Sequence, residues 1–281
     1  MARSLKFDHE VRKLTVRPDV TDLRDRYYRP SLVPLAREVV PGPEDLHIRN
    51  QYRESTCTAF ALAAVIDRQS RALFDAGARP RVSPRMLWEM ARLHDDLPDR
   101  TQRGSTLRGA LKGFFHNGVC QEDDAPYTPP PGTPPFRFTT TLADRARGIS
   151  LGAYFRLDHE INDYHSALNE AGSVIAAARL HEGWAHPVDG VIGRGEPLKG
   201  GHAFAIVGYD REGFLVQNSW GDRWGGYRRL PGVALWSYED WHANVEDAWV
   251  LRLAISSPRA FNVKFARNHK DLRVGTPSSS T

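Results

Sequence analysis

Cysteine is scarce in this 281-residue chain, which contains only Cys57 and Cys120. Domains that depend on disulfides are rich in cysteine, so this count argues against a disulfide framework and suits a reducing compartment. One amide and three carboxylate residues directly follow Cys120, and neighbouring carboxylates disfavour a thiolate. We therefore interpret Cys120 as structural and look to Cys57 for thiol chemistry.

Long apolar runs are missing too. No stretch approaches the roughly 20 apolar residues of a membrane-spanning helix. The first residues, from Met1 to Lys6, lack the apolar core of a secretory signal peptide. We expect no membrane association and a cytoplasmic site of action.

An excess of positive charge is confined to one end of the chain. The formal net charge is +4, and residues 257–281 account for it with five basic side chains against one acidic side chain. The remainder is balanced, so composition gives no support for a nucleic-acid partner. We expect this basic tail to be disordered.

Motifs for metals and phosphates are also missing. Histidine and acidic residues cluster at 158–165 and at 181–189, but neither cluster has the spacing of a zinc site. The glycines between 190 and 200 match no phosphate-binding pattern. We expect neither a metal nor a cofactor.

What is present is a junction around Cys57, where a polar, turn-rich segment runs into an apolar one. Ser55 and Thr56 are good N-cap residues, so we expect a buried helix that begins near residue 57. Backbone N–H groups and the helix dipole would favour a thiolate on the first turn. A lone cysteine in an Ala-rich helix is more often only buried, so other residues must decide between the two readings.

A hairpin is predicted far downstream, where two apolar strands flank a polar turn that ends in Gly213. If the hairpin folds about Arg211, His202 faces Trp220, and Asn218 is a diagonal neighbour on the same face. The Asn218 amide oxygen would then accept from one ring nitrogen of His202 and leave the other for a thiol. Trp220 would cover this contact.

These segments together resemble the papain-like cysteine peptidases, over roughly residues 45–255. By this resemblance Cys57 is the nucleophile, His202 the general base, Asn218 its orienting partner, and Gln51 an oxyanion-hole donor with the Cys57 backbone N–H. The resemblance also implies substrate-binding positions, which we assign to Gly104, Ser105, Gly201 and Trp220. An ordinary loop is the alternative for Gly104 and Ser105.

The chain departs from the family pattern at three positions. Glu54 stands where the family usually has a second cysteine, so the disulfide made by that cysteine is absent. Thr58 replaces the tryptophan that commonly follows the nucleophile. Gly201 replaces a polar residue before the histidine. None of these changes removes a catalytic group.

The resemblance implies an α+β, two-lobed papain-like fold, with a helical lobe, a β-barrel-like lobe and the active-site cleft between them. We place an extended arm at residues 1–45, the helical lobe at 46–135, the β-rich lobe at 136–256 and the tail at 257–281. The arm is too short and too rich in proline to be the family's helical propeptide. We expect no control by a propeptide of that kind.

Several other elements can be predicted locally. Ser83 and Pro84 mark the start of a helix on which Met86, Met90 and Leu93 share one core-facing side. Further predicted elements are helices at 108–116 and 161–170, a strand at 174–180, and a strand at 249–253 that closes the barrel.

The expected function is hydrolysis of peptide bonds in a peptide or protein substrate through a Cys57 thioester. Two enzyme alternatives use the same residues, namely a ligase in which an amine resolves the thioester and a hydrolase of non-peptide amides. A catalytically silent peptide-binding scaffold is a third alternative, against which the complete set of four catalytic residues argues.

Overall fold

The computed structural model describes residues 16, 18–20, 22–73, 81–96, 104–128 and 135–254. Its elements in chain order are η1 (Pro43–Asp45), α1 (Cys57–Leu73), α2 (Pro84–His94), α3 (Leu107–Asn117), α4 (Thr140–Ala146), β1 (Ser150–Arg156), α5 (Ile161–Ala171), β2 (Val174–His181), η2 (Glu182–Trp184), β3 (Pro197–Tyr209), β4 (Gly213–Gln217), η3 (Tyr227–Arg229), β5 (Val233–Ser237), α6 (Tyr238–Asn244) and β6 (Val245–Ala254). The predicted tail at 257–281 lies outside the described residues.

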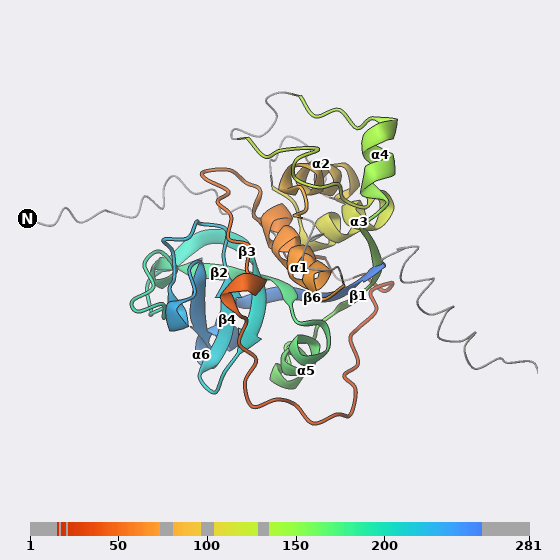
Figure 1. Cartoon of the computed structure of the whole chain (residues 1–281). Helices are drawn as coiled ribbons and strands as arrows, with labels where there is room; N and C mark the ends of the chain where they lie inside the picture. Colours follow the sequence, from red (N-terminus) through yellow and green to blue (C-terminus); the bar gives the residue numbers. More distant parts are fainter. Residues whose placement is uncertain are drawn as a thin grey trace, which may run out of the picture.

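Helices α1 to α4 gather on one side of the molecule, and the sheet with α5 and α6 forms the other side (Figure 1). Helix α1 begins at Cys57, as predicted, and every residue from 55 to 67 is buried. A helix that is apolar on all sides has to be packed all round. Accordingly α1 contacts both the helices α2 and α3 and the strands β2, β3 and β6, which places its first residue where the two lobes meet.

The caps of the helical lobe follow the predicted chemistry. The Ser83 hydroxyl accepts the backbone N–H of Met86 at 3.0 Å at the start of α2, and Gly118 ends α3 with a φ of 66°. Met86 and Met90 are buried, as predicted, but Leu93 is 56% exposed. The expectation for Leu93 is wrong because the last turn of α2 extends beyond the residues that cover the rest of that face.

Helix α4 belongs with the other helices. Its residues Leu142 and Ala146 pack in one cluster with Met86 and Met90. The boundary that we place between residues 135 and 136 follows residues 129–134, which lie outside the described residues. Because α4 comes after that boundary and packs on α2, the helical lobe receives one further helix.

The six strands form one antiparallel sheet in the order β1-β6-β2-β3-β4-β5. Strand β6 therefore lies inside the sheet, between β1 and β2, and the prediction that residues 249–253 close a barrel is wrong. Strand β1, which the sequence pattern did not predict, forms the edge next to β6, and β5 forms the opposite edge. Apolar clusters cover the sheet on both faces, one with α1 and one with α5 and α6.

The predicted hairpin is present as β3 and β4. Ala205 pairs with Gln217, which is the register of a hairpin centred on Arg211, and the ladder ends there because β4 ends at Gln217. The register shifts nearer the turn, between Ile206 and Gly208. The prediction of the hairpin is confirmed.

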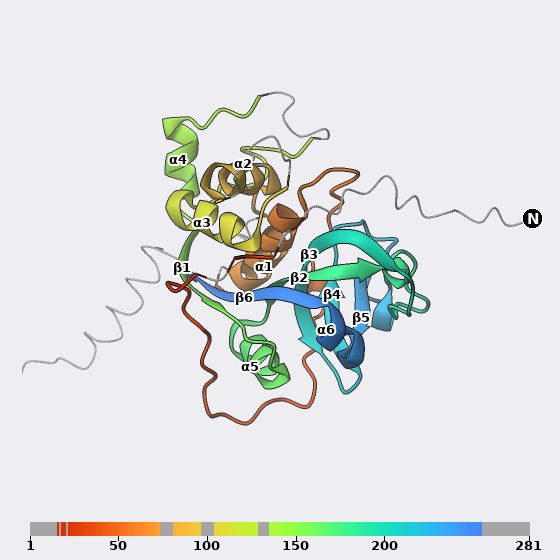
Figure 2. The same cartoon turned by 180° about the vertical axis from the view of Figure 1, so that it is seen from behind.

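The segment before α1 runs as an extended chain around the β-lobe and passes beneath α5 (Figure 1, Figure 2). Tyr28 bonds the backbone of Arg156 at the end of β1, and Val39 pairs with Tyr209 at the end of β3. Within the described residues, no helix combines the length and apolarity needed to cross a membrane.

Candidate active site

The centre of the site is the contact between His202 on β3 and Asn218 just after β4. His202 Nε2 lies 2.8 Å from Asn218 Oδ1, and the His202 side chain is fully buried. The ring of Trp220 packs over that of His202 with 4.8 Å between centroids and 35° between planes. The aromatic cover keeps water from competing for the hydrogen bond, as the sequence predicts.

Backbone contacts hold the Asn218 amide in this orientation. Its Oδ1 also accepts the backbone N–H of Ser219 at 2.7 Å, and its own backbone N–H donates to Gly232 at 3.0 Å. Because only the oxygen of the Asn218 amide can accept the Ser219 N–H, the oxygen and not the NH2 group faces His202. The histidine is thereby held with Nε2 as the donor and with Nδ1 as the nitrogen available to a thiol.

Cys57 lies on the first turn of α1 and is only 1% exposed. Its thiol contacts the backbone at Ala203, the residue after His202, which brings the nucleophile and the base together. Burial raises the pKa of the Cys57 thiol to about 11, against the opposing effect of backbone N–H groups at Ala203, Thr58 and Cys57 itself. The backbone N–H groups thus favour the thiolate, as expected, and desolvation of the buried sulfur opposes them more strongly.

Gln51 is buried beside this pair and is held at both ends of its amide. Its Oε1 accepts from the Ser219 hydroxyl at 2.5 Å, and its Nε2 donates to the Glu54 carbonyl at 2.7 Å. A carboxamide has two N–H groups, and this contact uses one of them. Ser219 thus joins Gln51 to the strand end that carries Asn218, a role that sequence reasoning missed although Ser219 lies inside the recognised motif.

The segment that carries Gln51 is fixed by both lobes. Arg49 pairs with Asp67 of α1 at 2.7 Å and donates to the carbonyl of Val82 at 3.0 Å. From the other lobe, the Gln217 amide donates to the carbonyl of His47 at 2.9 Å. An oxyanion donor must be positioned precisely. These contacts with both lobes fix the backbone that carries Gln51.

The four positions assigned to substrate binding lie around the catalytic residues. Gly104 and Ser105 are buried, and the Ser105 hydroxyl is 2.5 Å from that of Thr58, the residue after the nucleophile. Thr58, which replaces the family's tryptophan, thus links the first turn of α1 to the segment that carries Ser105. Gly201 precedes His202, and Trp220 covers it; their roles toward substrate remain predictions.

Other reactive side chains are engaged elsewhere. His165 contacts the Tyr238 hydroxyl at 2.8 Å and His181 contacts Asp240 at 2.8 Å. Among the described residues, no group of three or more ligand-type side chains could hold a metal ion. Burial, with the neighbouring Asp124, raises the pKa of Cys120 to about 11, and its side chain packs with Met86 and Met90 in the helical lobe.

Comparison with known proteins places this geometry in a family. The family described as papain family cysteine protease matches residues 44–232. A search of curated proteins found no significant match.

Solved structures with the same fold include bacterial and protozoan proteases. The cysteine protease xylellain from Xylella fastidiosa is 24% identical, with a TM-score of 0.72 over 86% of this chain and 97% of that one. ProCathepsin B S9 from Trypanosoma congolense is 17% identical, with a TM-score of 0.66 over 90% of each chain. The family match spans well over half of the sequence and contains all four predicted catalytic residues. The chain belongs to the papain family of cysteine proteases.

Proposed function

We propose that this protein hydrolyses peptide bonds with Cys57 as nucleophile, His202 as general base and acid, Asn218 as the residue that orients His202, and Gln51 as an oxyanion donor. The observation that carries the proposal is the hydrogen bond of 2.8 Å between His202 Nε2 and Asn218 Oδ1 beneath Trp220. It commits one ring nitrogen to orientation and reserves the other for the thiol.

The reaction balances with these groups alone. His202 removes the thiol proton, the sulfur attacks the peptide carbonyl carbon, and the resulting oxyanion accepts from Gln51 and from the Cys57 backbone N–H. The C–N bond breaks as His202 returns the proton to the leaving amine, which leaves a thioester. A water molecule, deprotonated by His202, attacks the thioester and releases the acid and the free thiol.

The test combines a peptide library with mass spectrometry of the intact protein. We expect an acyl adduct on Cys57 with slowly hydrolysed ester substrates, and cleaved peptides whose two products together weigh one water molecule more than the substrate. The matched variant Cys57→Ala should form no adduct. Products that carry an added amine in place of water would indicate a ligase, and an adduct on Cys120 would refute the assignment of the nucleophile.

A further inference from the structure

A cavity of about 410 Å³ lies at the edge of the sheet, where the N-terminal arm, helix α3 and strand β1 meet. Its walls come from the arm between Asp22 and Arg26, from one side of α3, and from residues 152–155 of β1. None of the four catalytic residues lines it. In the sheet, β6 and β2 separate β1 from β3, which carries His202, so three inter-strand spacings, about 14 Å in total, lie between them. The cavity is therefore separate from the catalytic centre.

Strand β1 turns open backbone groups toward this cavity. In an antiparallel strand, alternate residues direct both of their backbone groups to the same side. Arg156 directs both groups away from β6, because its N–H donates to the Arg26 carbonyl and its carbonyl accepts the N–H of Tyr28, each at 2.8 Å. Tyr154, two residues earlier, therefore also directs its N–H and its carbonyl away from β6. Among the described residues, no strand or bridge pairs with Tyr154 on that side.

A turn in the arm leaves these groups uncovered. Within the described part of the arm, the bridge to β1 joins Tyr27 to Arg156. Just before it, the N–H of Asp25 donates to the carbonyl of Asp22 at 3.0 Å, which turns the chain away from the strand. The Arg24 guanidinium bonds the Asp22 carboxylate at 2.7 Å and stabilises this turn. The cavity is the space between the turn and the strand.

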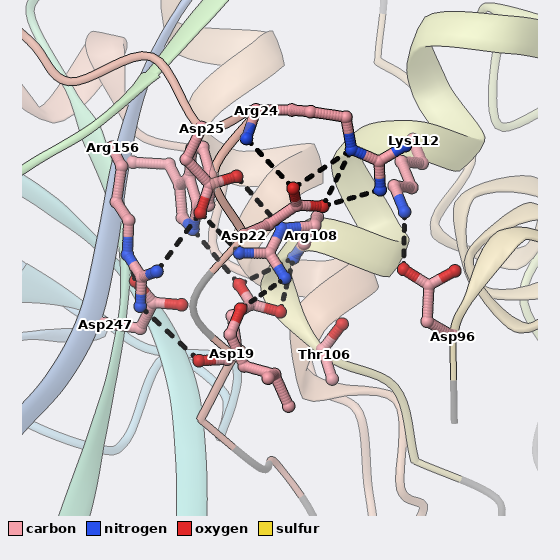
Figure 3. A network of polar contacts seen from close by, with 12 residues as sticks. Asp19, Asp22, Arg24, Asp25, Asp96, Thr106, Arg108, Lys112, Arg156 and Asp247 are labelled. Carbon is pink, nitrogen blue, oxygen red and sulfur yellow. Dashed lines mark hydrogen bonds and ion pairs between the residues drawn. The ribbon is translucent and has the colours of Figure 1, made fainter. Parts of the chain in front are cut away.

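The walls of the cavity carry an excess of positive charge, with four basic side chains against two acidic ones. Arg108 is paired with Asp25 at 2.5 Å, and Lys112 is paired with Asp96 at 2.5 Å (Figure 3). The Asp96 side chain is 70% exposed, and such a surface pair contributes little, so a ligand can replace it. Among the described residues, the Arg26 guanidinium has no partner. An anionic ligand therefore finds two available cations, Arg26 and Lys112.

Aromatic side chains form the apolar part of the wall. The rings of Phe115 on α3 and Tyr154 on β1 meet edge to face, with 6.2 Å between centroids. The Tyr154 ring is supported from behind by Trp249, at 5.7 Å between centroids. Phe115 is 50% exposed. An exposed ring on a fixed support offers contact area to an apolar side chain of a ligand.

We propose that this cavity binds an extended acidic peptide as an additional strand on β1. The peptide backbone bonds the N–H and the carbonyl of Tyr154, its carboxylates pair with Arg26 and Lys112, and an apolar side chain contacts Phe115. In strand addition, backbone hydrogen bonds supply affinity and alternate side chains supply specificity. A simple anion would use the cations alone, so the open backbone and the aromatic wall favour a peptide.

The test measures binding to the full-length Cys57→Ala protein, which lacks the candidate nucleophile. The probes are fluorescein-labelled hexapeptides in which glutamate alternates with each apolar residue in turn, and binding is followed by fluorescence anisotropy at low ionic strength. Matched peptides carry lysine in place of glutamate. We expect saturable binding of acidic peptides and none of lysine peptides, because the charge of the wall repels the latter. Failure of every acidic peptide to bind would overturn the proposal.

The variant Arg26→Ala tests the charged contact. It should weaken binding about tenfold, because a charge-assisted hydrogen bond is lost. Arg211→Ala is the matched control, because Arg211 is also exposed, lies at the turn between β3 and β4, and changes the net charge equally. Its affinity for the peptide should equal that of the parent protein. Equal weakening in the two variants would show non-specific attraction and refute the site.

The variants Tyr154→Pro and Tyr154→Ala separate the backbone contact from the ring. Both remove the ring, but only proline removes the N–H that faces the cavity, and proline is tolerated on an edge strand at such a position. Tyr154→Pro should therefore bind the peptide several-fold more weakly than Tyr154→Ala. In the parent protein, the peptide should also slow hydrogen exchange of the Tyr154 amide. Equal affinities together with unchanged exchange would overturn strand addition.

A final measurement separates this site from the catalytic cleft. Wild-type protein alkylated at Cys57 by a peptidyl vinyl sulfone should bind the acidic peptide with unchanged affinity. Loss of binding after alkylation would place the peptide in the cleft and overturn the proposal.

Discussion

The catalytic centre and the N-terminal arm are held in place by different forces. His202 and Asn218 are neutral or transiently charged groups in a setting of tryptophan, alanine and backbone amides. Asp25 of the arm is held by buried ion pairs with Arg108 and Arg156. Buried ion pairs balance a large desolvation cost against a large attraction. The geometry of the catalytic centre therefore depends on packing, and the position of the arm depends on charge.

If this comparison holds, changes in the catalytic centre lower kcat, and changes in the arm alter stability in a way that depends on charge and pH. The largest effect is expected for Cys57→Ala. Removal of the nucleophile should lower kcat at least about 10⁴-fold, while alanine suits the buried first turn of α1 and leaves thermal unfolding nearly unchanged. Cys120→Ala is the control and should keep full turnover. Residual activity of Cys57→Ala within tenfold of wild type would contradict the mechanism.

Gln51→Ala should reduce kcat by about 10²- to 10³-fold, because one oxyanion donor is lost while the Cys57 backbone N–H remains. The matched variant is Ser219→Ala, which removes the hydroxyl that holds Gln51 Oε1 but keeps the donor. It should cost less than Gln51→Ala. Steady-state kinetics that show both variants equal to wild type would require a different oxyanion donor.

Asn218→Ala is expected to lower kcat by about tenfold, less than the 10²- to 10⁴-fold expected for His202→Ala, whose imidazole carries the proton. An imidazole without its orienting amide still visits the productive orientation part of the time. The measurement is kcat for both variants at several pH values. An Asn218→Ala enzyme with wild-type kcat and a lowered melting temperature would assign Asn218 a purely structural role.

The smallest effect concerns pH and belongs to Asp19 of the arm. Burial and the facing Asp247 raise the pKa of Asp19 from 3.8 to about 8 in the folded chain, so folding takes up a proton at neutral pH. The contribution of Asp19 to stability is therefore greatest below pH 3.8 and is lost as pH rises toward 8. The groups that face Asp19 are Thr106, Arg108, Arg156, Asp247 and Trp249.

Asp19→Asn tests this dependence because it imitates the protonated carboxyl at every pH. The free energy of unfolding of Asp19→Asn, measured relative to wild type by urea denaturation, should increase between pH 5 and pH 8. A difference that is constant over this range would show that the carboxyl pair does not take up a proton on folding.

The sequence predicted local chemistry and short-range pairing well. The start of α1 at Cys57 and the Ser83 cap follow from capping preferences, and the contact between His202 and Asn218 follows from one hairpin register. Such features depend on residues close in the chain, so a pattern of a few residues determines them.

Long-range features were beyond prediction. The exposure of Leu93 and the interior position of β6 depend on which elements happen to cover them. The pKa of Cys57 is set by burial, and the bridge from Val16 to Gly201, 185 positions later, has no local pattern. The composition of the arm predicts an extended segment but does not predict the contacts of Val16 with Gly201 or of Asp25 with Arg108 and Arg156.

The second cysteine gives the molecule an internal reference. Cys120 and Cys57 are both 1% exposed, and burial raises the pKa of each to about 11, so the intrinsic reactivities of the two thiols nearly cancel in a ratio. A reagent reaches each thiol only when its surroundings open, which are the helical lobe for Cys120 and the meeting point of helix α1 with the sheet for Cys57. The ratio of the two labelling rates therefore compares the opening of these two regions within one chain.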